Sequence, residues 1–172
     1  LGMHGPNEEA PEHSALLAIG PDALPALRDR FPGRLWFNRW EPHIQPPPGR
    51  SVSGLCRTLV AFGEPAVPYV AELLKSEDPE TRYYATLIPA ELPHAGLVEA
   101  LSTTLFDDDQ GVSRSALYAL EKFQEQDGIE ELKESLRALA IAGDADQRSR
   151  LLSMRALAVL RDQECIASLF PA

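Results

Sequence analysis

Two stretches of the chain repeat one pattern: ALLAIGPDALPAL at residues 15–27 and TLVAFGEPAVPYV at residues 58–70. Five of the thirteen aligned positions are identical, among them Gly20 with Gly63, and four more exchange one apolar residue for another. A glycine between two apolar segments is typical of a turn that ends one helix and leads to the next. The repeat therefore predicts two copies of a helical hairpin.

Three later segments share a second pattern, in which an aspartate opens a helical segment and an arginine follows four or five positions on. Aspartate accepts hydrogen bonds from the free amides of the first helical turn, and its charge suits the helix N-terminus. A divalent-cation site at residues 107–109 with Asp144 and Asp146 is the alternative, but helix capping explains the same placement, and the chain shows no calcium-loop pattern. The predicted helix caps and ties are Asp78/Arg82, Asp109/Arg114 and Asp146/Arg150.

Second helices are expected between these segments, because apolar residues recur there at three- and four-residue spacing. No segment shows sustained alternation of β-branched residues, so we expect essentially no sheet. Pro89 lies deep in one predicted helix and predicts a kink or an early end near Ile88. The expected second helices cover residues 65–76, 95–106 and 129–142.

The pattern as a whole predicts about five hairpins, with starts separated by 31 to 43 residues. One hairpin cannot bury its apolar stripe alone, whereas stacked neighbours bury a continuous core. We therefore expect an all-α fold, a right-handed α-α superhelix over residues 14–172. Residues 1–13 are expected to form a flexible tail, and residues 32–50 a non-repeat insertion.

Three segments of the chain resemble the bacterial HEAT-repeat pattern, in which Asp-Pro-x-Val-Arg begins one helix and Ala-Val-Pro-x-Leu begins the next. They are DPETRYYATLIPAEL, DQGVSRSALYAL and AFGEPAVPYVAELL. The resemblance, which extends to the repeats of phycobilisome lyases, covers about residues 14–170 apart from the insertion. It implies a solenoid in which each leading aspartate and following arginine supports its hairpin and ties it to a neighbour. The motif is specific for the fold but says little about the function.

The insertion PGRLWFNRWEPHIQPPPGR carries both tryptophans of the chain and five prolines. The prolines exclude a long helix and favour an extended path. Tryptophan, phenylalanine and arginine dominate binding hot spots, which makes the insertion a candidate partner contact. It could equally fold back over its own core, or line a small-molecule pocket. The predicted contact set is Trp36, Phe37, Arg39 and Trp40, with Tyr83, Tyr84 and Tyr118 as secondary candidates.

The net charge of −10 argues against a nucleic-acid backbone or an anionic membrane as the main ligand. The chain contains no run of about 18 apolar residues that would predict a membrane span. Cys56 and Cys165 have no metal-binding spacing, and both are expected to be small buried residues. This cysteine usage is compatible with a cytoplasmic location.

The histidines show no metal spacing, and the chain has no nucleophile elbow, phosphate loop or dinucleotide fingerprint. We therefore predict a non-catalytic protein-interaction module without metal or cofactor, belonging to a longer bacterial protein or complex. Its expected partner is another protein or another domain of the parent chain. The alternative is a HEAT-like lyase, or another enzyme-associated subunit, that acts on a bound small molecule or chromophore.

Overall fold

The computed structural model describes residues 11–164, which form nine α-helices and four short 3-10 helices. The 3-10 helices are η1 (Pro21–Ala23), η2 (Gly49–Ser51), η3 (Glu64–Ala66) and η4 (Ala95–Leu97). The α-helices are α1 (Pro11–Ile19), α2 (Leu24–Asp29), α3 (Gly54–Phe62), α4 (Val67–Leu74), α5 (Pro79–Thr86), α6 (Val98–Leu105), α7 (Gln110–Leu120), α8 (Ile129–Ile141) and α9 (Gln147–Val159).

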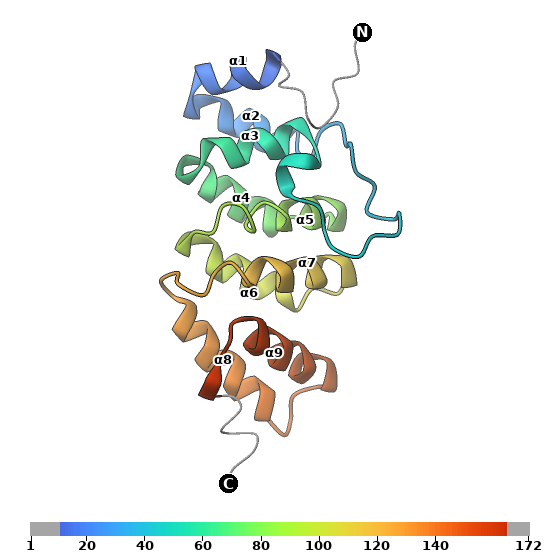
Figure 1. Ribbon diagram of the computed structural model, residues 1–172, viewed down its shortest axis with the longest axis vertical. Helices are drawn as coiled ribbons and strands as arrows, with labels where there is room; N and C mark the ends of the chain where they lie inside the picture. The colour runs from blue at the N-terminus through green and yellow to red at the C-terminus, as the bar shows by residue number, and fades with distance from the viewer. Residues whose placement is uncertain (1–10, 165–172) are drawn as a thin grey trace.

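The helices stack in two rows, as Figure 1 shows. Odd-numbered helices pack on odd-numbered ones (α5 on α7, α7 on α9), and even-numbered helices pack on even-numbered ones (α2 on α4, α4 on α6). We call these the odd row and the even row. The fold is an α-solenoid, as the sequence predicts. Four complete hairpins and the first helix of a fifth lie within residues 11–164, which agrees with about five in the whole chain.

The repeated stretch is the corner of a hairpin. Gly20 and Gly63 adopt φ of 81° and 65°, a region that favours glycine, and each is followed by a 3-10 turn and an even-row helix. In each copy a proline stands in the first turn of the helix, where no amide partner is needed. The glycine and the proline that both copies share are therefore the residues of the corner itself.

The three aspartates are helix caps, as predicted. Asp78 accepts hydrogen bonds from the amides of Glu80 and Thr81 at the start of α5. Asp109 caps α7, and Asp146 caps α9 by accepting from the amide of Ser149. The prediction for Pro89 is also confirmed, because α5 ends at Thr86 and a turn follows.

The arginines tie helices together, although not all in the way the resemblance implies. Arg82 reaches Asp107, in the turn before α7, with its Nε 2.6 Å and its Nη2 3.0 Å from the two carboxylate oxygens. Arg150 donates to the Ala140 carbonyl of α8 at 3.3 Å. Arg114 differs, because its guanidinium bonds a residue of the insertion rather than a neighbouring repeat.

A continuous core runs along the solenoid between the two rows. Leucine, valine, isoleucine and alanine side chains of both rows fill it, with Phe123 fully buried in the α7–α8 connection. Cys56 is also fully buried, as expected, while Cys165 lies outside the described residues. Stacking therefore buries what a single hairpin would expose.

The first helix begins earlier than the sequence predicts. Residues 11–13 belong to α1 and not to a tail, and the rest of the predicted tail lies outside the described residues. Within residues 11–164 there is no strand beyond an isolated bridge between Leu35 and Ser53. None of the helices in this range is long and apolar enough to cross a bilayer.

The partly buried Arg82–Asp107 pair leads to a stability prediction. The Asp107 side chain is 8% exposed, and one of its oxygens also accepts from the Asp109 amide at 2.9 Å. Asp107→Asn leaves the Arg82 guanidinium facing an amide, so we expect the free energy of unfolding to fall by about 3 kcal/mol. Glu99→Gln breaks the exposed Lys75–Glu99 pair and should cost less than about 1 kcal/mol. Equal losses in urea denaturation would contradict the assignment of Asp107 as a tie.

Candidate interaction surfaces

The insertion, residues 32–50, crosses the odd row as a strap. In Figure 1 it leaves the level of α3, descends beside the odd-numbered helices to the level of α7, and returns to η2. At its near end the Trp36 amide donates to the Val52 carbonyl at 2.8 Å. At its far end Arg114 of α7 donates to the Ile44 carbonyl at 3.0 Å. The strap therefore bridges from α3 to α7.

Arg39 is the main anchor of the strap. Its side chain is only 5% exposed, and its Nη2 lies 2.7 and 2.6 Å from the two carboxylate oxygens of Asp109. Its Nη1 donates to the Pro79 carbonyl at 3.3 Å, and its Nε lies 3.7 Å from Glu80. The guanidinium also contacts the ring of Tyr83, 4.4 Å from the centroid. One strap side chain thus joins the starts of α5 and α7.

Gly111 makes room for this anchor. A Cβ at this position would lie 3.1 Å from the Arg39 Nη2 and 3.0 Å from the Asp109 Oδ1. Both groups belong to the ion pair, so a side chain here would push its partners apart. The glycine in the first turn of α7 is therefore explained by the close approach of the guanidinium.

Two tyrosines of α5 complete the attachment. The Tyr84 hydroxyl donates to the Phe37 carbonyl at 3.4 Å and accepts from the Arg39 amide at 3.5 Å. Tyr83 and Tyr84 are 3% and 2% exposed, and burial raises the pKa of both phenols. They hold the chain's own strap.

The Asp109 carboxylate is charged at neutral pH. Burial alone would raise its pKa, but hydrogen bonds from Arg39 and from the amides of Val112 and Gly111 lower it below the ordinary value. A lowered pKa means that the anchor is fully present above the ordinary aspartate pKa and is lost only as the pH falls through the lowered one. The strap therefore stays fastened across the neutral range.

The predicted partner contacts fall into buried, half-buried and exposed residues. Arg39, Tyr83 and Tyr84 are buried, which corrects their place among the partner contacts, because their side chains are occupied in holding the strap. Trp36, Phe37 and Tyr118 are half-buried, and Arg57 lies over the Trp36 ring, 5.0 Å from its centroid. Trp40 is 73% exposed, and Ile44, which the sequence analysis passed over, is 93% exposed. The strap covers its own core and still presents an apolar tip.

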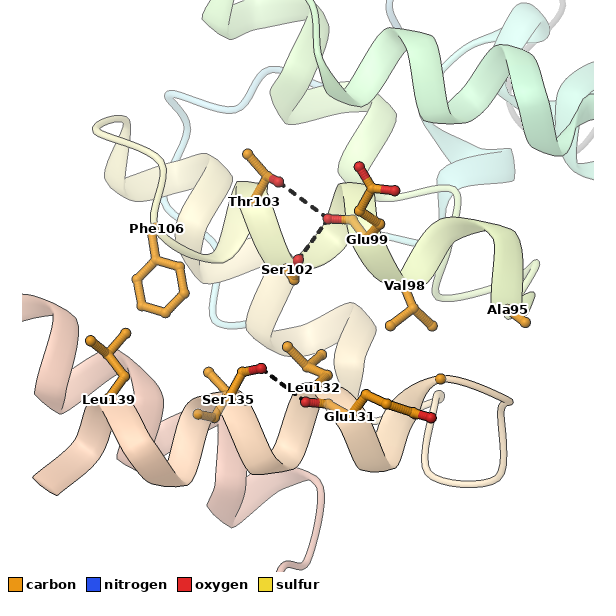
Figure 2. A pocket seen from close by; sticks show the side chains of 12 residues that line it. Ala95, Val98, Glu99, Ser102, Thr103, Phe106, Glu131, Leu132, Ser135 and Leu139 are labelled. Atoms are coloured by element: carbon orange, nitrogen blue, oxygen red, sulfur yellow. Dashed lines mark hydrogen bonds between the residues drawn. The ribbon is translucent and has the colours of Figure 1, made fainter. Parts of the chain in front are cut away.

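A separate groove lies on the even row between α6 and α8. It is open to solvent and has a volume of about 630 Å³, and Figure 2 shows Val98 and Phe106 on one wall facing Leu132 and Leu139 on the other. Short side chains, such as Ala95, leave the space between the two helices unfilled. The sequence analysis did not identify this groove, because its apolar residues follow the same helical spacing as those of the core.

The polar residues of the groove are satisfied within their own helices. Ser102 and Thr103 donate to the Glu99 carbonyl, at 2.7 and 3.2 Å, and Ser135 donates to the Glu131 carbonyl at 3.0 Å (Figure 2). These hydroxyls do not need a partner from a ligand. The exposed carboxylates of Glu99 and Glu131 lie one on each wall. Glu99 pairs with Lys75 at 3.2 Å, so the groove is apolar inside and carries the acidic charge of Glu131 on the α8 side.

The family model for HEAT repeats matches residues 67–139, from α4 into α8. Residues 67–139 contain HEAT repeats. The match confirms the resemblance and includes both walls of the α6–α8 groove, but not the strap. HEAT repeats are generally protein-interaction scaffolds and are typically not enzymes. A search of curated proteins finds no match to the chain.

The HEAT repeats carry little that suggests catalysis. Within residues 11–164 no three histidine, cysteine, aspartate or glutamate side chains are grouped so as to hold a metal ion. Burial raises the pKa of the Cys56 thiol to about 12, so that this cysteine is a poor nucleophile. Of the aspartates considered as a cation site, Asp109 and Asp146 cap α7 and α9, and Asp107 bonds Arg82.

The strap generates the second prediction, since both tryptophans of the chain report on it. Arg39→Ala removes the anchor, so we expect increased quenching of tryptophan emission by acrylamide and a red shift from Trp36. Arg39→Lys keeps the charge but loses the planar fork, and should give an intermediate result. Arg30→Ala, an exposed arginine at the end of α2, is the control. Unchanged emission from a folded Arg39→Ala protein would contradict the proposed anchor.

Proposed function

We propose that this HEAT-repeat chain is a non-catalytic protein-interaction module that binds an amphipathic helix of a partner in the α6–α8 groove. The observation that carries the proposal is the groove itself, an apolar channel of about 630 Å³ within the matched repeats. Helix-in-groove recognition uses such a channel, with apolar anchors spaced along one face of the bound helix.

The dimensions of the groove support this occupant. Lining residues extend over 95–106 on one wall and 128–139 on the other. At 1.5 Å per residue each wall is about 17 Å long, which accommodates about three helical turns. The lining hydroxyls are already bonded, so burying apolar side chains against them leaves no donor unsatisfied.

The charge of the groove indicates the polar face of the partner. Glu131 lies beside the apolar floor with its carboxylate exposed, and the chain as a whole carries a net charge of −10. A helix with lysine or arginine beside its apolar face would complement the Glu131 carboxylate and the overall negative charge, and would associate faster for that reason. The proposed partner segment is therefore basic as well as amphipathic.

Two sequence-based expectations remain proposals. Trp40 is proposed as a partner contact on the strap because it is large, aromatic and exposed, with Trp36, Phe37 and Tyr118 contributing their exposed edges. A cytoplasmic location and a bacterial parent protein rest on cysteine usage and on the repeat pattern.

The third prediction tests the function by filling the groove. Ser135→Trp places an indole in the channel without removing a core side chain, and Ala61→Trp makes the same addition at an exposed position of α3. In quantitative affinity capture from an extract of the native host, we expect Ser135→Trp to lose a specific protein at least tenfold while Ala61→Trp retains it. The captured protein should contain a basic amphipathic helix.

The same comparison defines failure. If the folded Ser135→Trp variant captures the same proteins in the same amounts as the unaltered chain, the α6–α8 groove is not the binding site. Circular dichroism of both variants establishes that the helices are intact before capture.

A further inference from the structure

A second groove lies on the odd row, between α7 and α9, and encloses about 460 Å³. Its walls carry Arg114 from α7 and Arg148 and Arg155 from α9, with Leu117 and Leu151 between them. Three arginines in one groove are unusual for a chain that has 16 cationic residues against 26 acidic ones. The groove is basic on an acidic protein.

The charges of these arginines are poorly neutralised. Arg114 donates to the Ile44 carbonyl, which carries no net charge. Arg148 lies 3.6 Å from Asp108, whose side chain is fully exposed, and also bonds the Asp107 carbonyl. Arg155 has no hydrogen bond or ion pair to any residue in the described range 11–164. The groove therefore holds at least two guanidinium groups without a carboxylate partner in that range.

The spacing of the arginines suits an extended chain. Arg148 and Arg155 are seven residues apart on α9, which places them on one face about 10.5 Å apart. An extended segment in the polyproline II conformation has three residues per turn and rises about 3.1 Å per residue, so carboxylates three residues apart lie on one face about 9.3 Å apart, close to this distance. Leu151 lies between the two arginines and is 46% exposed, which provides an apolar contact for an intervening side chain.

The strap forms the continuation of this groove. Gly111 and Arg114 line both the groove and a smaller adjoining cavity of about 150 Å³, whose other walls include Trp40 and His43. Trp40 and Ile44 are the most exposed large apolar side chains of the strap. A segment lying along the arginines would therefore reach an aromatic anchor at its end.

We propose that the α7–α9 groove binds an extended acidic segment of a partner protein. Carboxylates of the segment pair with Arg148, Arg155 and Arg114, and an apolar side chain packs against Trp40. Such a segment carries few charges. Because charges more than about 8 Å apart are screened at physiological ionic strength, the segment interacts mainly with the nearby arginines and little with distant acidic residues. A long phosphodiester chain meets the net charge of −10 over its whole length and is disfavoured. This site lies on the opposite row from the α6–α8 groove and does not depend on the function proposed there.

The fourth prediction uses a defined probe. The probe is a fluorescein-labelled decapeptide with glutamate at every third position and leucine at the positions between. The control peptide has glutamine in place of each glutamate. Fluorescence anisotropy at physiological ionic strength measures binding to the full chain. We expect the glutamate peptide to bind and Arg148→Gln/Arg155→Gln to weaken it about tenfold, because close charge pairs at interfaces are strongly coupled.

Two controls separate the groove from general electrostatics. Arg30→Gln/Arg161→Gln changes the net charge by the same amount at exposed positions outside the groove, and should leave the affinity unchanged. Trp40→Ala tests the aromatic anchor and should weaken the leucine-containing peptide several-fold. Ser135→Trp should have no effect, so failure of this site and failure of the α6–α8 groove are distinguishable.

Three results would overturn the proposal. The first is equal binding of the glutamate and glutamine peptides, or no binding of either. The second is an equal loss of affinity in the two double-arginine variants. The third is tighter binding of a labelled single-stranded oligothymidine than of the glutamate peptide, which would identify nucleic acid as the ligand class.

Discussion

The carboxylate of Asp109 makes two sets of bonds at once. It accepts from the amides of Gly111 and Val112, which starts α7, and it pairs with Arg39, which fastens the strap. The first set resembles the caps of α5 and α9, whereas the second is particular to this hairpin. Because the strap lines the cavity that adjoins the arginine-lined groove, Asp109 also helps to shape the odd-row surface.

The repeated features were predictable because their causes are local. A glycine corner, an aspartate cap and a proline near Ile88 act within a few residues, so the sequence alone indicates where helices begin and end. Stacking follows from one apolar stripe per helix. The Arg39–Asp109 bond joins residues 70 positions apart, and no local pattern reveals such a pair. Gly111 is a sign of this pair in the sequence, but its role can be understood only from the structure, where the Arg39 guanidinium lies beside it.

The functional surfaces show the same division. Sequence reasoning identified the strap by its composition but could not tell inward from outward side chains, so it grouped buried Arg39 with exposed Trp40. It also missed both grooves. The α6–α8 groove arises where short side chains on two helices face one another, and the α7–α9 groove where arginines of two helices converge. Both grooves depend on which helices are neighbours, and this is set by the stacking of the helices in two rows.

Hydrogen–deuterium exchange of the unaltered chain and of Asp109→Asn tests the shared role of Asp109 most directly. Loss of the carboxylate should release the strap, so amides of residues 36–41 should exchange faster together with those of the first turn of α7. The amides of α3 and α4, in the preceding hairpin, should be unaffected. Faster exchange at the start of α7 with an unchanged strap would contradict the account, because Asp109 would then be a helix cap alone.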